Sequence, residues 1–200
     1  MIAYSTIVAD PPWAQRTGPM SGGGMGLGFI GGQRASQPLA YPTMTLEQIK
    51  ALPVGDLAAA DAHLYVWATN QFLPGAFQVL TAWGFRYSTT LVWRKALMGG
   101  GLGGAWRINT EFVLFARRGT LSATGVVRGT CFDWKRPYGP PVKQGERRQT
   151  MHSVKPDEFQ DLVESVSPGP YLELFARRRR LGWDVWGNEV ESDVELEEAA

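Results

Sequence analysis

The sequence predicts an α/β protein organised around a parallel β-sheet. Strand-like runs of β-branched and aromatic residues flank a stretch of helical periodicity, in the order His63–Ala68, Gln71–Trp83 and Phe85–Trp93. A strand, a helix and a second strand at this spacing are typical of a crossover unit, which joins parallel strands. The 200 residues contain 44% apolar side chains and eight tryptophans, enough for one domain with a substantial core.

The first predicted strand, Ile7–Ala9, ends at the sequence Asp10-Pro11-Pro12-Trp13. Two consecutive prolines cannot continue a β-ladder, and they hold Asp10 and Trp13 on stiff backbone whose carbonyl oxygens are free. Such a group suits a flat ring that carries an amine. Asp10 and the Pro11 carbonyl can accept the two N–H groups, and Trp13 can stack on the ring. A strand end followed by an ordinary proline turn explains the same residues equally well.

Residues 14–40 form a long polar stretch that is rich in glycine. The glycines fit no G-x-G-x-x-G pattern between a strand and a helix, which argues against a dinucleotide site. Long loops in compact domains are commonly lids or binding loops, and this one leaves directly from the Asp10–Trp13 rim. Disorder without a role is the alternative interpretation.

Two further elements carry clear local signals. Thr45–Gln48 has the pattern of a capping box, which predicts a short helix that ends near Pro53. Asn109–Arg117 is predicted as a core strand, with the polar side chains of Asn109 and Glu111 near its start. Polar residues in such a strand lie at a sheet edge or face a site, and the pattern alone favours neither.

Basic and aromatic residues are interleaved in two segments, 94–107 and 118–151. Cations beside exposed rings can hold phosphates and unstacked bases, so both segments are predicted to contact nucleic acid. A flexible connection and a solvated loop are the respective alternatives. The predicted contact residues are Lys95, Arg107, Lys135, Arg136, Lys143, Arg147 and Arg148.

The last part of the chain contains three candidate sites for polar ligands. Pro156 suits the first position of a helix, which places Lys155 at a helix entrance where an anion is stabilised. The next strand runs into Arg177–Arg180, which suit a phosphate or a carboxylate, or a simple surface turn. Asn188 and Glu189 can bond vicinal hydroxyls.

The net charge of +1 is distributed unevenly along the chain. Residues 189–200 contain six acids and neither lysine nor arginine, and we expect this tail to be disordered beyond a single domain at 1–188. The remaining 20 basic and 13 acidic residues give that domain a charge of +7. This excess is compatible with a polyanionic partner, and a solvated basic surface is the alternative.

Cys131 is the only cysteine, and His63 and His152 are the only histidines. One chain therefore assembles neither a disulfide framework nor a zinc site of cysteine and histidine, and we expect no metal. No apolar run approaches about 18 residues, and Met1 leads directly into a strand pattern. We therefore expect a cytoplasmic protein that enters no membrane.

Six motifs occur in order along the chain: D-P-P-W, Y-P-T-M-x-L-E-x-I, L-V-W-x-K, H-S-x-K-P, E-L-F-A-R and W-x-x-W-G-N-E. This ordered set resembles the MT-A70 family of S-adenosylmethionine-dependent adenine N6-methyltransferases over nearly all of residues 1–190. The resemblance implies a Rossmann-like methyltransferase fold with a mainly parallel sheet and helices on both faces. The motif order is permuted, with D-P-P-W first and the donor-binding strand last.

The resemblance also implies roles for individual residues. The implied catalytic residues are those of the D-P-P-W motif, Asp10, Pro11, Pro12 and Trp13. The implied contacts with the methyl donor, S-adenosylmethionine, are Asp10, Lys155, Leu174, Phe175, Arg177, Asn188 and Glu189. Among these, Lys155 matches the lysine at the carboxylate of the donor, and the Asn188-Glu189 pair matches the residues at its ribose.

The implied reaction is transfer of a methyl group to the exocyclic N6 amine of adenine in nucleic acid, with DNA favoured over RNA. Inside a duplex this amine is out of reach, so the base has to be flipped or unpaired. Methylation of RNA is one alternative, and a non-catalytic nucleic-acid-binding protein of the same fold is another. The intact D-P-P-W motif favours catalysis, because a pseudo-enzyme is expected to lose the aspartate or the prolines.

Overall fold

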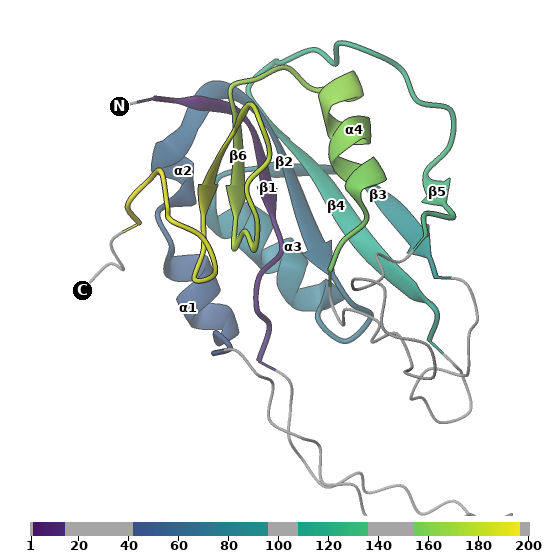
Figure 1. Ribbon diagram of the computed structural model, residues 1–200, viewed down its shortest axis with the longest axis horizontal. Coiled ribbons are helices and arrows are strands. Elements are labelled where there is room, and N and C mark those ends of the chain that lie inside the picture. Colours follow the sequence, from purple (N-terminus) through teal and green to yellow (C-terminus); the bar gives the residue numbers. More distant parts are fainter. Residues whose placement is uncertain (1, 15–41, 96–107, 136–153, 197–200) are drawn as a thin grey trace, which may run out of the picture.

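The structure is a computed structural model that describes residues 2–14, 42–95, 108–135 and 154–196. The elements that these residues form are shown in Figure 1. In chain order they are β1 (Tyr4–Ala9), α1 (Leu46–Ala51), α2 (Val54–Leu57), β2 (Ala58–Ala68), α3 (Leu73–Ala82), β3 (Arg86–Arg94), β4 (Thr110–Arg118), β5 (Cys131–Phe132), α4 (Asp157–Val166), β6 (Tyr171–Leu174) and β7 (Trp183–Trp186).

The strands form one mixed sheet in the order β5-β3-β4-β2-β1-β6-β7. β1 pairs in parallel with β2 and β6, β6 pairs in parallel with β7, and β3 pairs in parallel with β5. β4 is antiparallel to both of its neighbours, β2 and β3. All the strands of this sheet except β4 therefore run in the same direction, which confirms the predicted mainly parallel sheet. The sequence did not predict the reversed strand between β2 and β3.

Helices cover both faces of the sheet, as predicted (Figure 1). Ile7 and Ala9 of β1 belong to the core cluster that includes side chains of α1, α2 and α3. Val8, which lies between them, belongs to the other cluster, where Phe159 and Val163 of α4 pack. Successive side chains of a strand point to opposite faces, so β1 is buried on both sides.

The local signals for two helices have different outcomes. Thr45 caps α1 with a complete capping box. Its hydroxyl accepts from the backbone N–H of Gln48, and the side-chain oxygen of Gln48 accepts from the backbone N–H of Thr45. In α4, Pro156 has extended backbone and occupies the N-cap position instead of the first helical turn. Lys155 therefore lies one residue further from the helix than the sequence indicates.

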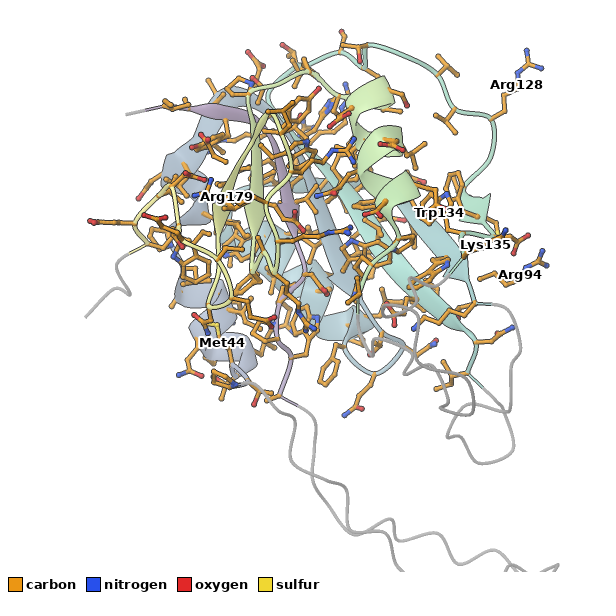
Figure 2. The ribbon with its side chains drawn as sticks, in the orientation of Figure 1. Met44, Arg94, Arg128, Trp134, Lys135 and Arg179 are labelled. Carbon is orange, nitrogen blue, oxygen red and sulfur yellow. The ribbon has the colours of Figure 1, made fainter. Side chains whose placement is uncertain are left out.

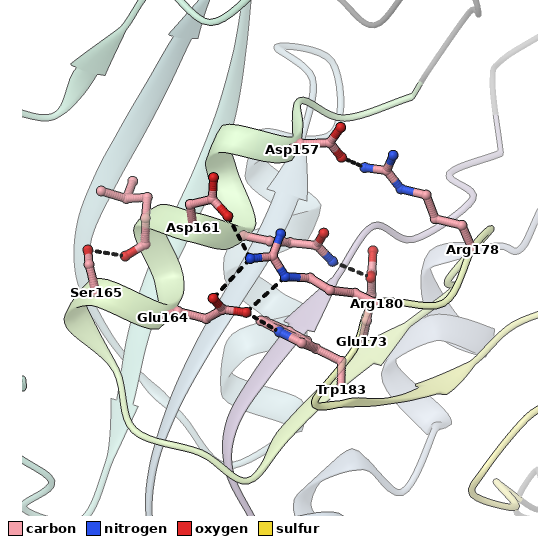
Figure 3. A network of polar contacts seen from close by, with 10 residues as sticks. Asp157, Asp161, Glu164, Ser165, Glu173, Arg178, Arg180 and Trp183 are labelled. Carbon is pink, nitrogen blue, oxygen red and sulfur yellow. Dashed lines mark hydrogen bonds and ion pairs between the residues drawn. The ribbon is translucent and has the colours of Figure 1, made fainter.

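Ion pairs fasten α4 to the chain that follows β6 (Figure 3). Arg180 bonds both Glu164 and Asp161 on α4, and Arg178 bonds Asp157 at the start of the same helix. Trp183 donates its indole N–H to Glu164, 2.7 Å away. Because three of these acids lie on one face of α4, that face of the helix is tied to the connection between β6 and β7.

The described part of the acidic tail contacts the domain, which differs from the disordered segment that its composition predicts. The Asp193 amide donates to the Val185 carbonyl, and the Asp193 carboxylate accepts from the Val185 amide and from Arg179. Val194 and Leu196 pack against the core.

Among the described residues, no helix is long and apolar enough to cross a membrane.

His63 on β2 is a buried histidine with both ring nitrogens occupied. Its Nδ1 lies 2.7 Å from the Ser167 hydroxyl and its Nε2 lies 3.2 Å from the Leu121 carbonyl. A carbonyl only accepts, so Nε2 carries the proton and Nδ1 accepts from Ser167. Burial lowers the pKa of His63, and the nearby charge of Arg117 lowers it further, so the folded protein favours the neutral ring.

We expect His63 to make the free energy of unfolding decrease as the pH is lowered. A histidine whose pKa is lower in the folded than in the unfolded protein stabilises the fold fully above its ordinary pKa of about 6.5. It loses that contribution as the pH falls below that value. Urea unfolding at pH values between 7.5 and 5 measures the slope. The His63→Phe variant contains the same carboxylates and is the control, so equal slopes for the two proteins would contradict the prediction.

Candidate active site

Three elements bring charged side chains together at one end of the strands, where the parallel strands have their carboxyl ends. Asp10 follows the carboxyl end of β1, and Lys155 lies just before α4. Glu111 lies near the start of β4, and because β4 runs in the opposite direction, its start reaches the same edge. The site therefore depends on the reversed strand.

A chain of ion pairs links these residues. The Lys155 ammonium lies 2.8 Å from an Asp10 carboxylate oxygen and 3.4 Å from one of Glu111. Lys95 pairs with the other oxygen of Glu111. The two lysines also lie over indole rings, Lys155 at 5.1 Å from the centre of Trp67 and Lys95 at 4.9 Å from that of Trp93.

The two carboxylates of this network differ in their electrostatics. Burial by itself raises the pKa of Glu111, but the charges of Lys155 and Lys95 outweigh it and lower the pKa below the usual value. Burial raises the pKa of Asp10, which Lys155 opposes and the charge of Glu111 reinforces. The pKa of Lys155 is raised, because its two carboxylate partners outweigh the effect of burial. Lys155 is therefore charged at neutral pH.

The D-P-P-W segment is held in place by backbone bonds and by Trp13. The Pro11 carbonyl accepts from the Trp13 amide at 2.8 Å, and the Pro12 carbonyl accepts from the Met44 amide at 2.9 Å. The Trp13 indole donates to the Trp67 carbonyl at 3.1 Å and stacks on Phe72. Only 8% of Trp13 is exposed, so this residue anchors the segment, and stacking on a base stays a prediction.

A hollow lies beside Asp10 at the ends of β1, β6 and β7. It brings together five of the residues that the resemblance implies for the donor: Asp10, Phe175, Arg177, Asn188 and Glu189. Leu174 is fully buried behind it, and Lys155 contacts Asp10 without lining the hollow. The remaining lining residues are Pro12, Pro42, Met44, Ala176, Trp186 and Gly187.

The backbone of this hollow is tightly built. Phe175 has a φ of 63°, in the left-handed region that is costly for a residue with a side chain, and its ring packs edge-on against Trp186. The Ala176 amide donates to the Trp186 carbonyl at 2.9 Å. A Cβ atom on Gly187 would meet the Ala176 carbonyl oxygen at 2.3 Å, so only glycine allows this approach.

The predicted nucleic-acid contacts are less fully described. Lys95 directly follows β3 and is paired with Glu111, so it belongs to the charge network described above. Lys135 is exposed next to Trp134, as Figure 2 shows, near the end of β5. Arg107, Arg136, Lys143, Arg147 and Arg148 lie outside the described residues, as do segments 15–41 and 96–107 of the two glycine-rich loops.

Sequence reasoning missed the part that Glu111 plays. Its position in an otherwise apolar strand was consistent with a site or with an edge strand, and the structure places it near the start of β4, an interior strand, with 8% exposed. Met44 and Trp186 also line the hollow without having been predicted. Trp186 had a signal, because it lies two residues before Asn188 in the W-x-x-W-G-N-E motif.

The sequence profile of the MT-A70 family matches residues 4–189. The chain is 30% identical over 205 residues to the type II methyltransferase M.MunI of a Mycoplasma species, with 94% of this chain and 78% of that protein aligned. It is 28% identical to the N6-methyladenosine RNA methyltransferase MTA1 of Cryphonectria parasitica and 27% identical to the mouse N(6)-adenine-specific methyltransferase METTL4. In each case 94% of this chain is aligned, but only 52% and 37% of those proteins.

We expect Lys155→Ala to lower the free energy of unfolding by about 3 kcal/mol, because it leaves two largely buried carboxylates without their shared cation. Urea unfolding at pH 7.5 measures the change. The double variant Lys155→Met, Glu111→Gln removes one of these carboxylates together with the cation, and is expected to recover part of the loss. A Lys155→Ala protein as stable as the parent would contradict the network described above.

Proposed function

The chain belongs to the MT-A70 family, and we propose that it transfers a methyl group from S-adenosylmethionine to the N6 amine of adenine in nucleic acid. The observation that carries this proposal is the position of Asp10. Its carboxylate lines the hollow at the ends of β1, β6 and β7, and it also bonds Lys155 at the edge of the sheet. A group in this position can contact a donor on one side and an acceptor amine on the other.

The chemistry of the hollow fits the donor. Phe175 and Trp186 offer aromatic surface for the adenosyl group, and the exposed side chains of Asn188 and Glu189 offer partners for ribose hydroxyls. Arg177 supplies a cation in the lining, and Lys155 supplies a second one behind Asp10. When bound, S-adenosylmethionine supplies an electrophilic methyl group on its sulfonium.

The residues of this chain activate the amine and position it. The lone pair of the adenine amine is delocalised into the ring, so the amine is a poor nucleophile. In this proposal Asp10 and the Pro11 carbonyl accept its hydrogens, which favours a pyramidal nitrogen and stabilises positive charge as the N–C bond forms. The Pro11 oxygen accepts one bond, from Trp13, and a carbonyl oxygen has a second lone pair. With nitrogen, methyl and sulfur aligned, the methyl–sulfur bond would break as the N–C bond forms, the sulfur would leave as a neutral thioether, and the nitrogen would then lose one proton to solvent.

We propose DNA as the main substrate, with RNA as the alternative. Relatives of both kinds support this range, because they include a type II methyltransferase and an RNA methyltransferase. The charge of +7 on residues 1–188 suits either polyanion. A target adenine inside a duplex has to leave the base stack before its amine reaches Asp10.

We expect Asp10→Asn to reduce methyl transfer at least 100-fold, on the pattern of losing one preorganised polar contact to the transition state. Labelled donor, followed by identification of the modified nucleoside, measures the reaction on matched duplex DNA, single-stranded DNA and RNA. The control is Asp56→Asn, which changes an exposed aspartate in α2 and is expected to retain full activity. Near-normal methylation by a folded Asp10→Asn protein would exclude this role for Asp10.

We expect Asn188→Ala to weaken binding of the donor about 5- to 150-fold, which corresponds to about 1 to 3 kcal/mol for one lost hydrogen-bonding partner. Calorimetry with S-adenosylmethionine and without nucleic acid measures the affinity. Glu191→Ala alters an exposed side chain in the same segment but outside the hollow, and is the control. If both variants bind the donor as the parent does, Asn188 does not contact it.

A further inference from the structure

A second hollow lies at the opposite end of the sheet from Asp10. It is lined by Arg86, Tyr87 and Ser88 at the start of β3 and by Arg117, Gly119 and Thr120 at the end of β4. Arg86 and Arg117 are directly paired across the two strands. Like charges in directly opposite positions repel each other, so this pairing costs stability that a bound anion would recover.

The protein offers no carboxylate to this pair within the described residues. Arg86 donates to the Gly119 carbonyl at 3.3 Å, and Arg117 donates to the Leu121 carbonyl at 2.9 Å. The arginines after β6 differ, because each is paired with an acid: Arg177, Arg178, Arg179 and Arg180. The positive charges that were predicted to bind phosphate after β6 are therefore neutralised by acids of the protein. Within the described part of the chain, Arg86 and Arg117 bond only carbonyl oxygens, so their charges can be neutralised by a bound anion.

The groups around the two arginines suit a tetrahedral oxyanion. A guanidinium presents parallel N–H donors that match phosphate oxygens, and two of them can hold one phosphate from two sides. Ser88 and Thr120, which carry hydroxyl groups, line the same hollow. Asp61 is outside the lining, and its Oδ1 accepts from the hydroxyl and the backbone amide of Thr120, which ties the chain after β4 to β2.

We propose that this hollow binds a phosphate group. β3 spans nine residues between Arg86 and Arg94, so the hollow lies about 26 Å from the catalytic edge at about 3.3 Å per residue. It is therefore too far away for the methyl donor or the target base. If the phosphate belongs to nucleic acid, which rests on the proposed function, it lies roughly eight base pairs from the target adenine at about 3.4 Å per pair. A free phosphorylated molecule is the other source.

Titration with inorganic phosphate tests the site directly. Calorimetry and the arginine Nε–H resonances in NMR spectra report saturable binding to the parent, and the double variant Arg86→Gln, Arg117→Gln is expected to bind at least tenfold more weakly. Arg128→Gln is the matched control, because Arg128 is exposed at the outer end of the connection from β4 to β5 (Figure 2). Arg117→Lys keeps the charge without the planar fork, and thermal unfolding checks that each variant is folded.

Two duplexes distinguish the sources of the phosphate. One extends about 4 base pairs on either side of the target adenine and the other about 15. Binding of the long duplex by the double variant is expected to depend less on salt, with the slope of log affinity against log salt smaller by roughly 2, and binding of the short one is expected to match the parent. Weakened phosphate binding with unchanged binding of the long duplex assigns the site to a free phosphorylated molecule.

The proposal is overturned if the parent does not bind inorganic phosphate saturably, or if the folded double variant binds it as tightly as the parent does. Neither measurement depends on methyl transfer. Methylation of the short duplex by the parent tests the proposed function separately, because that duplex does not reach the second hollow.

Discussion

The site depends on one cation shared by two carboxylates. Lys155 joins the end of β1 at Asp10 to the start of β4 at Glu111, and it does so from the entrance of α4. Two carboxylates this close cannot both be ionised at low cost without a cation between them. The lysine therefore opposes the effect of burial on the pKa of Asp10 and connects three elements. Stability and chemistry are coupled at this point of the fold.

Sequence reasoning succeeded where the signal is local. Proline at a strand end and a capping box at Thr45 each have a physical meaning that does not depend on the rest of the chain. The reversal of β4 and the pairing of Glu111 with Lys155 depend on which strands become neighbours, and no short pattern encodes that. The family motifs predicted most of the residues that line the hollow beside Asp10. They did not predict the left-handed backbone of Phe175 or the close approach at Gly187, which only the three-dimensional structure shows.

The distribution of charge illustrates the same limit. An excess of basic residues indicates an anionic partner, but it does not indicate which cations are free to meet it. The four arginines after β6 look like a binding cluster in the sequence, and all four are paired with acids of α4 or of the C-terminal segment. Arg86 and Arg117 are separated by 31 positions and share no motif, yet the register of β3 and β4 places the two side by side.

The two ends of the glycine-rich segment 15–41 are joined by the chain that flanks it. The Met44 amide donates to the Pro12 carbonyl, and the Met44 carbonyl accepts from the Ala14 amide, so the chain entering the segment and the chain leaving it are held together close to Asp10. The entropy of closing a loop between fixed ends grows slowly, by about 0.6 kcal/mol for each doubling of its length. Insertions, deletions and substitutions between these ends are therefore expected to cost little stability, so the sequence next to Asp10 can vary while the position of Asp10 itself is unchanged.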